Sequence, residues 1–354
     1  MSEISPKPPI VTEVVIIGAG PCGLFQVFEL GLLGISCHLV DSLAAAGGQC
    51  TELYPDKPIY DIPALPTCGA QELIDRLMQQ ISPFNAPLHL GQEVTALHKR
   101  EDGRFDVETI VGTRFDAGAV VIAGGVGSFQ PRRLGAQGTE QFERHVHYRV
   151  RDAAQYHGKK LVIFGGGDSA LDWVIDFAGK AASVTHVHRR AEFRAAPASV
   201  AKMQALVKAG QVSYIEGLAD GLLGTDLLHD GTGGTLTHVV VKANDGSWPK
   251  IPADHVFAFF GLHPKLGPIA EWGMELEKKA LRVDTEKFQT SIPGIFAVGD
   301  INTYPGKKKL ILSGFHEAAL AAFAIQHHLY PAKKQFLQYT TTSPVMQKRL
   351  GVPH

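Results

Sequence analysis

Residues 12–23, TEVVIIGAGPCG, decide the fold of this 354-residue chain. The first six are rich in apolar, β-branched residues, which is typical of a strand buried in a parallel sheet. A turn with glycines at G-x-G-x-x-G spacing follows at once, then apolar residues at helical spacing, and then a second strand at 36–40 that runs into Asp41. This order predicts a β-α-β unit of the kind that binds a dinucleotide.

Each glycine of this turn has its own task. Gly18 permits the tight turn, Gly20 lets the backbone approach a pyrophosphate, and Gly23 allows close packing of helix on strand. The helix N-terminus would offer N–H donors to the phosphates. Asp41, eighteen residues after Gly23, would accept hydrogen bonds from a ribose diol. Because a carboxylate repels a 2′-phosphate, the site suits the unphosphorylated adenosine of FAD or NAD.

The same pattern returns 147 residues later. An apolar strand at 160–164 runs into a second glycine turn, a helix follows at 171–178, and a strand at 183–187 ends in a cationic cluster. Guanidinium groups bind a phosphate bidentately, so this site suits NADPH. A solvated basic face is the alternative for the cluster. Its members are His188, Arg189, Arg190 and Arg194.

Composition excludes several functional classes. Hydrophobic residues make up 45% of the chain, which is enough for sizeable cores, and a net charge of −1 argues against a nucleic-acid-binding protein. The most apolar stretch contains Glu29 and several glycines, which argues against a membrane span. The N-terminal residues lack the apolar run of a signal peptide. The four cysteines form no C-x-x-C pair and no zinc motif. We therefore expect a cytoplasmic protein.

Longer motifs carry a resemblance to a known family. They are the glycine turn at 18–23, GGQCTELYPDKPIYDIP at 47–63, GGGDSALDW at 165–173, HRRAEFRA at 188–195 and GIFAVGDI at 294–301. Together they resemble the thioredoxin-reductase-like (type 2) ferredoxin–NADP⁺ reductases over nearly the whole chain. The resemblance implies an α/β fold with two Rossmann-like, three-layer domains. Residues 1–128 and 290–354 would form an FAD domain with a C-terminal extension from about 331, and residues 129–289 an NADPH domain.

The resemblance also implies roles for single residues. Tyr54 would stack on the isoalloxazine of FAD, and Asp300 would bind the ribityl chain. Tyr339 in the C-terminal extension would cover the opposite flavin face, from the other subunit of a homodimer. The expected FAD site comprises Gly18, Gly20, Cys22, Gly23, Asp41, Gln49, Tyr54, Val94 (by its backbone on the adenine side), Phe129 (near the isoalloxazine), Asp300 and Thr341. The expected NADPH site comprises Gly165, Gly167, Asp168, Ser169, His188, Arg189, Arg190 and Arg194.

The absence of cysteine after position 68 indicates how electrons would leave the flavin. Thioredoxin reductases carry a C-x-x-C pair in the NADPH domain, and residues 168–176 contain no cysteine. Electrons should pass directly to ferredoxin or flavodoxin, since flavin accepts a hydride and can release single electrons. Two alternatives stay open. One is a flavin reductase of another acceptor, such as a quinone or a separate thiol protein, and the other is a non-enzymatic NADPH or redox sensor.

Two further groups of residues call for an interpretation. Lys307, Lys308 and Lys309 form the densest basic run, which would suit docking of an acidic ferredoxin, although a solvated loop is the plain alternative. The histidine pairs at 145 and 147 and at 186 and 188 each share one face of a predicted strand. We favour surface or phosphate-contacting roles for them over metal ligation, and predict no metal site.

Overall fold

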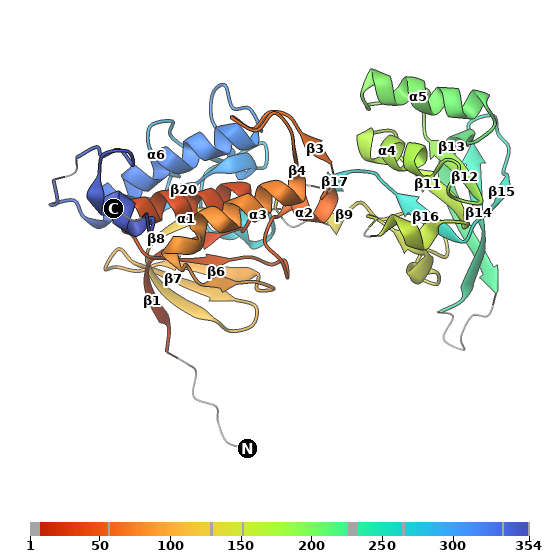
Figure 1. Cartoon of the computed structure of the whole chain (residues 1–354). Helices are drawn as coiled ribbons and strands as arrows, with labels where there is room; N and C mark the ends of the chain where they lie inside the picture. Colours follow the sequence, from red (N-terminus) through yellow and green to blue (C-terminus); the bar gives the residue numbers. More distant parts are fainter. Residues whose placement is uncertain are drawn as a thin grey trace, which may run out of the picture. The chain divides into compact units, whose positions relative to one another are not determined.

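The chain divides into two compact units (Figure 1). The computed structural model describes residues 8–55, 57–127, 130–150, 152–225, 233–263, 266–334 and 336–352. The first unit comprises Met1–Ser128 and Pro264–His354, and the second comprises Phe129–His263. The first unit is therefore discontinuous in sequence, and the second is inserted into it.

A seven-stranded sheet forms the centre of the first unit. Its order is β5-β2-β1-β8-β7-β6, with β20 paired to β8. Strands β5, β2, β1, β8 and β20 run parallel to one another. Strand β7 pairs antiparallel with both β8 and β6. The strands of the first unit, of which β3 with β4 and β18 with β19 and β21 form two smaller sheets, are β1 (Ile10–Ile17), β2 (Cys37–Val40), β3 (Pro58–Ile59), β4 (Cys68–Gly69), β5 (Leu88–His89), β6 (Val94–Lys99), β7 (Phe105–Thr109), β8 (Arg114–Ile122), β18 (Leu276–Glu277), β19 (Ala280–Arg282), β20 (Ile295–Ala297) and β21 (Asn302–Thr303).

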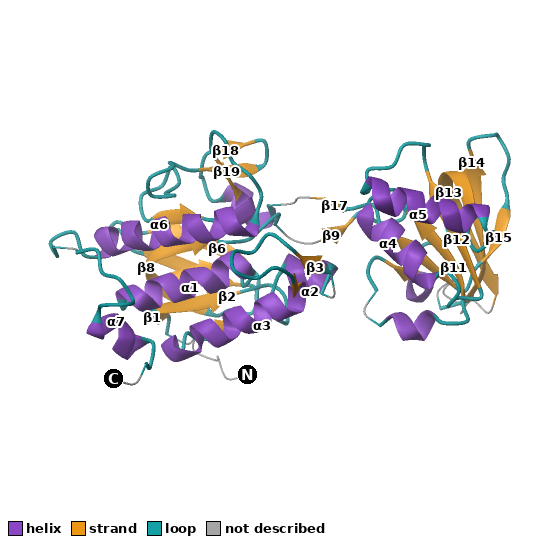
Figure 2. Cartoon of the chain, turned by 45° about the horizontal axis from the view of Figure 1, so that its top comes forward, coloured by secondary structure: helices purple, strands orange, loops and turns teal. Residues whose placement is uncertain are grey.

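Helices cover this sheet (Figure 2). The α-helices are α1 (Pro21–Leu33), α2 (Gln49–Leu53), α3 (Ala70–Ile81), α6 (Ile311–Leu329) and α7 (Pro344–Arg349), and the 3₁₀ turns are η1 (Ser82–Phe84), η4 (Gly267–Glu271) and η5 (Gly299–Ile301). α1 packs against both α3 and α6. It buries Leu24, Val27 and Leu30 on one face and ends at Gly34, whose φ of 74° is the left-handed conformation that glycine adopts readily.

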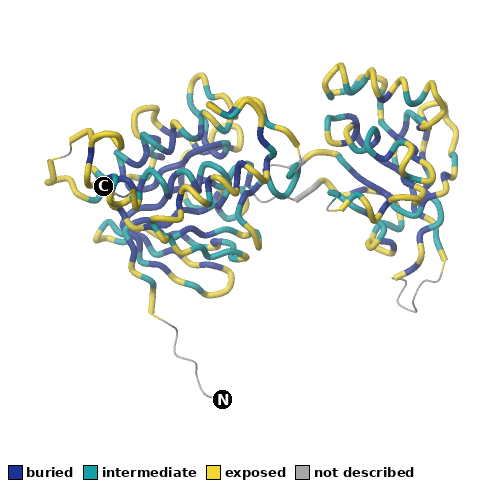
Figure 3. Tube along the Cα trace, in the orientation of Figure 1, coloured by how far each residue is buried: buried dark blue, intermediate teal, exposed yellow. Residues whose placement is uncertain are grey.

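The core of the first unit follows from the β-branched runs of the sequence. Val14, Val15 and Ile16 of β1 are fully buried, because parallel strands carry helices or further chain on both faces. Figure 3 shows the buried segments along the central strands and the inner faces of the helices. The expected strand at 12–17 lies within β1, and the apolar residues at helical spacing over 70–81 form α3.

The second unit repeats the design with a different edge. Its seven-stranded sheet has the order β10-β16-β11-β12-β13-β14-β15. The strands β10, β16, β11, β12 and β13 pair in parallel, and β13, β14 and β15 pair antiparallel. Its elements are β9 (Gln130–Pro131), η2 (Glu143–His145), β10 (Val146–His147), η3 (Ala153–Tyr156), β11 (Lys160–Phe164), α4 (Asp168–Phe177), β12 (Ser183–His188), α5 (Pro197–Lys208), β13 (Ser213–Thr225), β14 (Thr235–Ala243), β15 (Lys250–Pro252), β16 (His255–Ala258) and β17 (Leu262–His263).

The second boundary between the units differs from the expected one at 289/290, because it falls between residues 263 and 264. Residues 266–289, which we expect in the NADPH domain, belong to the first unit. Their strand β19 pairs in parallel with β21, and Leu281 and Phe288 join the core of the first unit. Within the described residues, no helix is both long and apolar enough to cross a bilayer.

Candidate dinucleotide-binding sites

The first glycine turn joins β1 to α1. Gly18 has a φ of 114°, and its N–H donates to Val40 O at 2.8 Å. A Cβ at Gly18 would lie 2.4 Å from Ala123 O, and one at Gly23 would lie 1.9 Å from Gly18 O, so neither position has room for a side chain. Gly20 faces open space, with no atom within 4 Å of a Cβ built there. The turn therefore leaves room for a diphosphate at Gly20, against the N-terminus of α1.

Asp41 follows β2 and turns back to the same glycine turn. Its Oδ2 accepts the Ala19 N–H at 2.5 Å, and its Oδ1 accepts the Leu43 N–H at 2.7 Å. Burial raises the pKa of the Asp41 carboxyl, and these two donors oppose that shift. A carboxylate has about four lone-pair sites, so two remain for a ribose diol.

The loop at 47–54 packs onto the turn. Gly47 N donates to Ala19 O at 2.8 Å, and a Cβ at Gly48 would lie 3.2 Å from Gly20 Cα. Gln49 and Tyr54 stand at the two ends of the short helix α2. The amide Nε2 of Gln49 lies 3.3 Å from a Cβ built at Gly125, a residue just beyond β8. Gln49 is thus held beside the carboxyl end of β8, in the region where ligands bind in open α/β sheets.

Asp300 joins the same group. Burial is the main reason that the pKa values of Cys22, Cys50 and Tyr54 are raised. The carboxylate of Asp300 adds to the shift at all three, so its charge lies near each of them. The glycine turn, the 47–54 loop and the Gly299-Asp300 segment therefore converge, although they are far apart in sequence.

The first-unit cysteines here are packing residues. Cys22 Sγ packs closely against Gly299 and Gly314: a Cβ built at these glycines would lie 3.0 and 2.2 Å from the sulfur. Burial raises the pKa of the Cys22 thiol to about 12. Cys50 is buried, with its Sγ 3.8 Å from the Tyr54 hydroxyl. Both thiols stay protonated at neutral pH, which disfavours a nucleophilic role.

The remaining residues that we expect at the FAD site fall into two groups. Val94 is buried at the start of β6, two residues after Gln92, whose N–H donates to Asp41 O at 2.8 Å. This contact ties the segment to the adenosine end of the site. Tyr339 and Thr341 are exposed in the C-terminal segment. Phe129 lies outside the described residues.

The second glycine turn repeats the first. Gly165 has a φ of 143°, its N–H donates to Val187 O at 3.1 Å, and a Cβ there would lie 2.5 Å from Phe259 O. Gly167 faces open space, as Gly20 does. Asp168 and Ser169 begin α4, and Asp168 Oδ1 accepts the Ala196 N–H at 2.8 Å. This turn leaves room for a second diphosphate.

His188 is the counterpart of Asp41. Val40 and Val187 each pair with the last strand residue before a glycine turn, so the residues that follow them are equivalent. The His188 imidazole lies over Gly166, where a Cβ would be 2.2 Å from the ring, and stacks on Phe193 with the ring centroids 5.2 Å apart. A ring in this place closes one side of the second site.

The neighbouring arginines are held by their backbones. Asn244 donates to Arg189 O at 3.3 Å, Tyr214 donates to Arg190 O at 3.4 Å, and Arg194 N donates to Gly166 O at 2.7 Å. None of the three guanidinium groups forms an ion pair with any residue that the structure describes, and Arg190 Nε is buried without a partner. Cationic residues without a described ion-pair partner therefore follow the strand that ends beside the second glycine turn, which fits a 2′-phosphate.

The chain is similar in sequence to known proteins over nearly its whole length. The family profile of the pyridine nucleotide-disulphide oxidoreductases matches residues 15–299. The ferredoxin–NADP reductase 2 of Cupriavidus metallidurans is 59% identical over 345 residues, which cover 97% of this chain and 92% of that protein. The ferredoxin–NADP reductase of Albidiferax ferrireducens is 60% identical over 349 residues and 97% of both chains. The chain belongs to the ferredoxin–NADP reductase family.

Solved structures place this reductase in the thioredoxin-reductase fold. Thioredoxin reductase of T. acidophilum matches with a TM-score of 0.71 and 25% identity, covering 89% of this chain and 97% of that one. The bacillithiol disulfide reductase of Staphylococcus aureus matches in fold with a TM-score of 0.73 and 18% identity, covering 92% and 100%. The expected α/β fold with two Rossmann-like domains and the expected family are confirmed.

The C-terminal segment, residues 336–352, lies away from Tyr54 of the same chain. Arg349 of α7 donates to Leu32 O at 2.6 Å, at the end of α1 opposite the glycine turn. α1 has 13 residues, so these ends are about 20 Å apart. Figures 1 and 2 agree in placing α7 and α2 at opposite ends of the first unit. Within one chain, the structure does not bring Tyr339 to the site.

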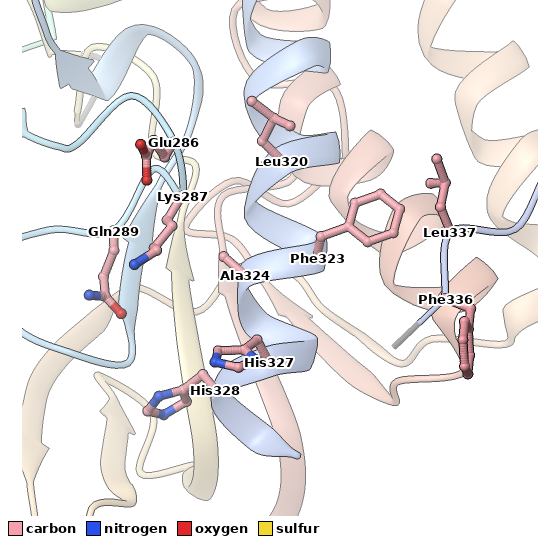
Figure 4. Close-up of a pocket in the computed structure, with 10 residues that line it drawn as sticks. All are labelled: Glu286, Lys287, Gln289, Leu320, Phe323, Ala324, His327, His328, Phe336 and Leu337. Carbon is pink, nitrogen blue, oxygen red and sulfur yellow. The ribbon is translucent and has the colours of Figure 1, made fainter. Parts of the chain in front are cut away.

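A pocket of about 570 Å³ lies beneath this segment (Figure 4). Phe323 points from α6 towards the stretch that carries Phe336 and Leu337, both about two-thirds exposed. The lining residues are Glu286, Lys287, Gln289, Leu320, Phe323, Ala324, His327, His328, Phe336 and Leu337. Apolar side chains thus stay open to solvent on this face of the first unit.

The basic run is not a uniform surface patch, because the side chain of Lys307 is buried. Its Nζ bonds to Glu317 and to Gly299 O, and its side chain is only 7% exposed. Lys308 and Lys309 are exposed. The sequence signal for this pair is Glu317, which stands among the buried alanines of α6, where a carboxylate needs a partner.

The histidines bond to one another and to the backbone. His145 Nδ1 lies 2.9 Å from Asp254 O, and His147 Nε2 lies 3.0 Å from His255 Nδ1. Burial lowers the pKa of His147 to about 4. Buried His186 lies with its Nε2 2.7 Å from Gly165 O, so it supports the second glycine turn. Among the described residues, no group of three or more metal-ligating side chains is placed to hold a metal ion.

Proposed function

We propose that this chain is an FAD-dependent oxidoreductase that transfers electrons between NADPH and ferredoxin or flavodoxin. The observation that carries the proposal is the pair of matched glycine turns. One has a carboxylate after its second strand, and the other has His188 followed by two arginines at the equivalent place. The relatives named ferredoxin–NADP reductase, at 59–60% identity, support the choice of acceptor.

Each site supplies a separate contribution. In the first, Gly20 and the N-terminus of α1 would receive the diphosphate of FAD, Asp41 the adenosine ribose and Asp300 the ribityl chain, while Tyr54 would exclude water from the flavin. In the second, Gly167 would receive the diphosphate of NADPH and the arginines its 2′-phosphate. Bound FAD supplies the exchange between two-electron hydride transfer and single-electron transfer. The protein contributes positioning rather than an acid or base.

A direct exit of electrons fits the cysteines. All four are free, none follows position 68, and Cys22, Cys37 and Cys50 each have a raised pKa from burial. We therefore favour an external acceptor over a thiol relay, and no observation favours a quinone or a sensor role. The free cysteines also suit the reducing cytoplasm, which we propose as the location.

We further propose a homodimer in which the C-terminal segment covers the flavin of the partner subunit. Phe336, Leu337 and Tyr339 are 68, 66 and 63% exposed. Three large apolar side chains so close together are typical of a surface that another chain covers. The anchoring of α7 at the far end of α1 supports action on a second chain.

Visible spectroscopy tests the proposal. The purified protein should show flavin absorption that NADPH bleaches without oxygen, and the reduced protein should then support ferredoxin-dependent reduction of cytochrome c. Bleaching without turnover with ferredoxin or flavodoxin would favour the sensor. Turnover with a quinone alone would replace the acceptor.

A further inference from the structure

A buried ion pair lies beside the first site, outside the residues expected to touch FAD. Glu317 of α6 is fully buried, and the Lys307 side chain is 7% exposed. Two charges at this depth are costly to desolvate, so the pair persists only where further hydrogen bonds complete it. The contacts of the pair show what it holds.

Both charges bind one residue, Gly299. Glu317 Oε2 accepts the Gly299 N–H at 2.7 Å, and Lys307 Nζ donates to Gly299 O at 2.9 Å. The Asn302 amide donates to Glu317 Oε2 and to Ala297 O, both at 2.8 Å. The backbone from the end of β20 to the start of β21 is thereby tied to α6.

Tyr304 completes the pair. Its hydroxyl donates to Glu317 Oε1 at 2.9 Å, and its ring centroid lies 5.3 Å from Lys307 Nζ. Both carboxylate oxygens of Glu317 are therefore satisfied. Burial, followed by the bond to Glu317, raises the pKa of Tyr304 to about 12, so this hydroxyl stays a donor at neutral pH.

The held residue has a left-handed backbone and immediately precedes Asp300. Gly299 has a φ of 80°, and a Cβ there would come within 3.0 Å of Cys22 Sγ. An unrestrained glycine samples many backbone conformations. A small rotation at Gly299 would move Asp300, whose charge reaches Cys22, Cys50 and Tyr54.

We propose that Lys307 and Glu317 are positioning residues for FAD: they clamp Gly299 and so hold Asp300 in the cofactor site. The inference rests on the proposed function only in that FAD occupies the first site. It assigns no contact between the pair and the cofactor. Its effect must therefore pass through Asp300.

A double-mutant cycle on the FAD-loaded full-length protein tests this path. The variants are Glu317→Gln, Asp300→Asn and the two together, and the measurement is the rate at which flavin fluorescence rises on dilution. Glu317→Gln alone should speed FAD release by about ten-fold or more, because one charge of the pair stays buried and unpaired. In the Asp300→Asn background it should add less than about two-fold. Two effects that multiply would overturn the proposal, and so would unchanged release from Glu317→Gln.

Matched variants separate positioning from general destabilisation. Lys307→Met should speed release, and Lys308→Met at its exposed neighbour should not. Tyr304→Phe removes one hydrogen bond and neither charge, and serves if Glu317→Gln fails to fold. It should still speed FAD release and shift the visible flavin bands while the far-ultraviolet circular dichroism stays unchanged. Unchanged release and bands in Tyr304→Phe would count against the clamp. These readouts need neither NADPH nor ferredoxin, so the clamp and the proposed acceptor can fail separately.

Discussion

Asp41 and His188 stand at the same position of two similar β-α-β units. Each follows a valine, Val40 or Val187, whose carbonyl accepts the N–H of the first glycine of the turn. One unit thus presents a carboxylate held by two backbone donors, and the other an imidazole followed by two arginines. A carboxylate in one unit, and cations directly after the equivalent position in the other, allow a single chain to distinguish two dinucleotides that differ by one phosphate.

The arginines should set the preference for NADPH. Changing Arg189 and Arg190 together to Gln should raise the KM for NADPH roughly 10- to 100-fold and leave that for NADH almost unchanged, because a charge-assisted hydrogen bond contributes about 1.5–3 kcal/mol. Steady-state kinetics with both nucleotides measures this. Lys202→Gln, at an exposed cation on α5, is the control. A preference that survives the double change would place the phosphate site elsewhere.

Asp41 should set the retention of FAD. Asp41→Ala removes the ribose acceptor and leaves the Ala19 and Leu43 N–H groups without their partner, so FAD affinity should fall about 10- to 100-fold. Asp41→Asn keeps an acceptor oxygen and should lose less. Equilibrium titration of the stripped protein with FAD compares the three. Full affinity in Asp41→Ala would reject the role.

Buried His186 should make the protein less stable in acid. Burial lowers its pKa to about 4, below the ordinary value of 6.5. The unfolded chain therefore binds a proton that the folded chain resists, and stability should be lost as the pH falls from about 6.5 to 4. At pH 5 the loss approaches roughly 2 kcal/mol, at about 1.4 kcal/mol per pKa unit.

Urea unfolding at pH 7.5 and pH 5 measures that loss. His186→Gln should flatten the pH dependence, even if it lowers stability at both values. His98→Gln, at an exposed histidine, should leave the dependence as it is. An equal slope in wild type and His186→Gln would remove His186 from the account.

Tyr54 and Tyr339 should act on one flavin from two subunits. Tyr54→Ala should weaken FAD binding, and Tyr339→Ala should speed flavin reduction by NADPH several-fold, because a ring over the flavin must move before hydride transfer. In a mixed dimer of the two variants, action across subunits leaves one site intact and one doubly altered. Action within a subunit leaves no intact site. Stopped-flow reduction of the purified mixed dimer distinguishes the two patterns.

Lys308 and Lys309 remain the candidates for ferredoxin docking, without Lys307. Reversing both charges to Glu should slow ferredoxin reduction severalfold at low salt and flatten its salt dependence, because docking of an acidic partner gains from exposed cations. Reduction of a small neutral dye should stay unchanged. Equal loss with both acceptors would point to damage at the flavin instead.

The local signals of the sequence held because their causes are local. Gly18 has a φ near 114° and Gly23 lies close to Gly18 O, so neither position admits a side chain. The spacing of these two glycines can therefore be recognised from the sequence alone. The β-branched run of β1 and the helical spacing of α3 likewise reflect burial on a strand or on one helix face. The sequence by itself thus determined the two dinucleotide-binding units and the residue types at their ends.

Tertiary structure alone decided what depends on distant partners. In the sequence, Lys307 belongs to a basic run that is expected to be exposed. In the structure, it forms a buried ion pair with Glu317 of α6. The second boundary between the units lies at 263/264 rather than at the expected 289/290, because β19 pairs with β21 of the first unit. No local sequence pattern predicts this pairing. Which residue of the cationic cluster is equivalent to Asp41 follows from strand register, which selects His188. Burial, pairing and register are properties of segments far apart in sequence, so they exist only once the chain has folded.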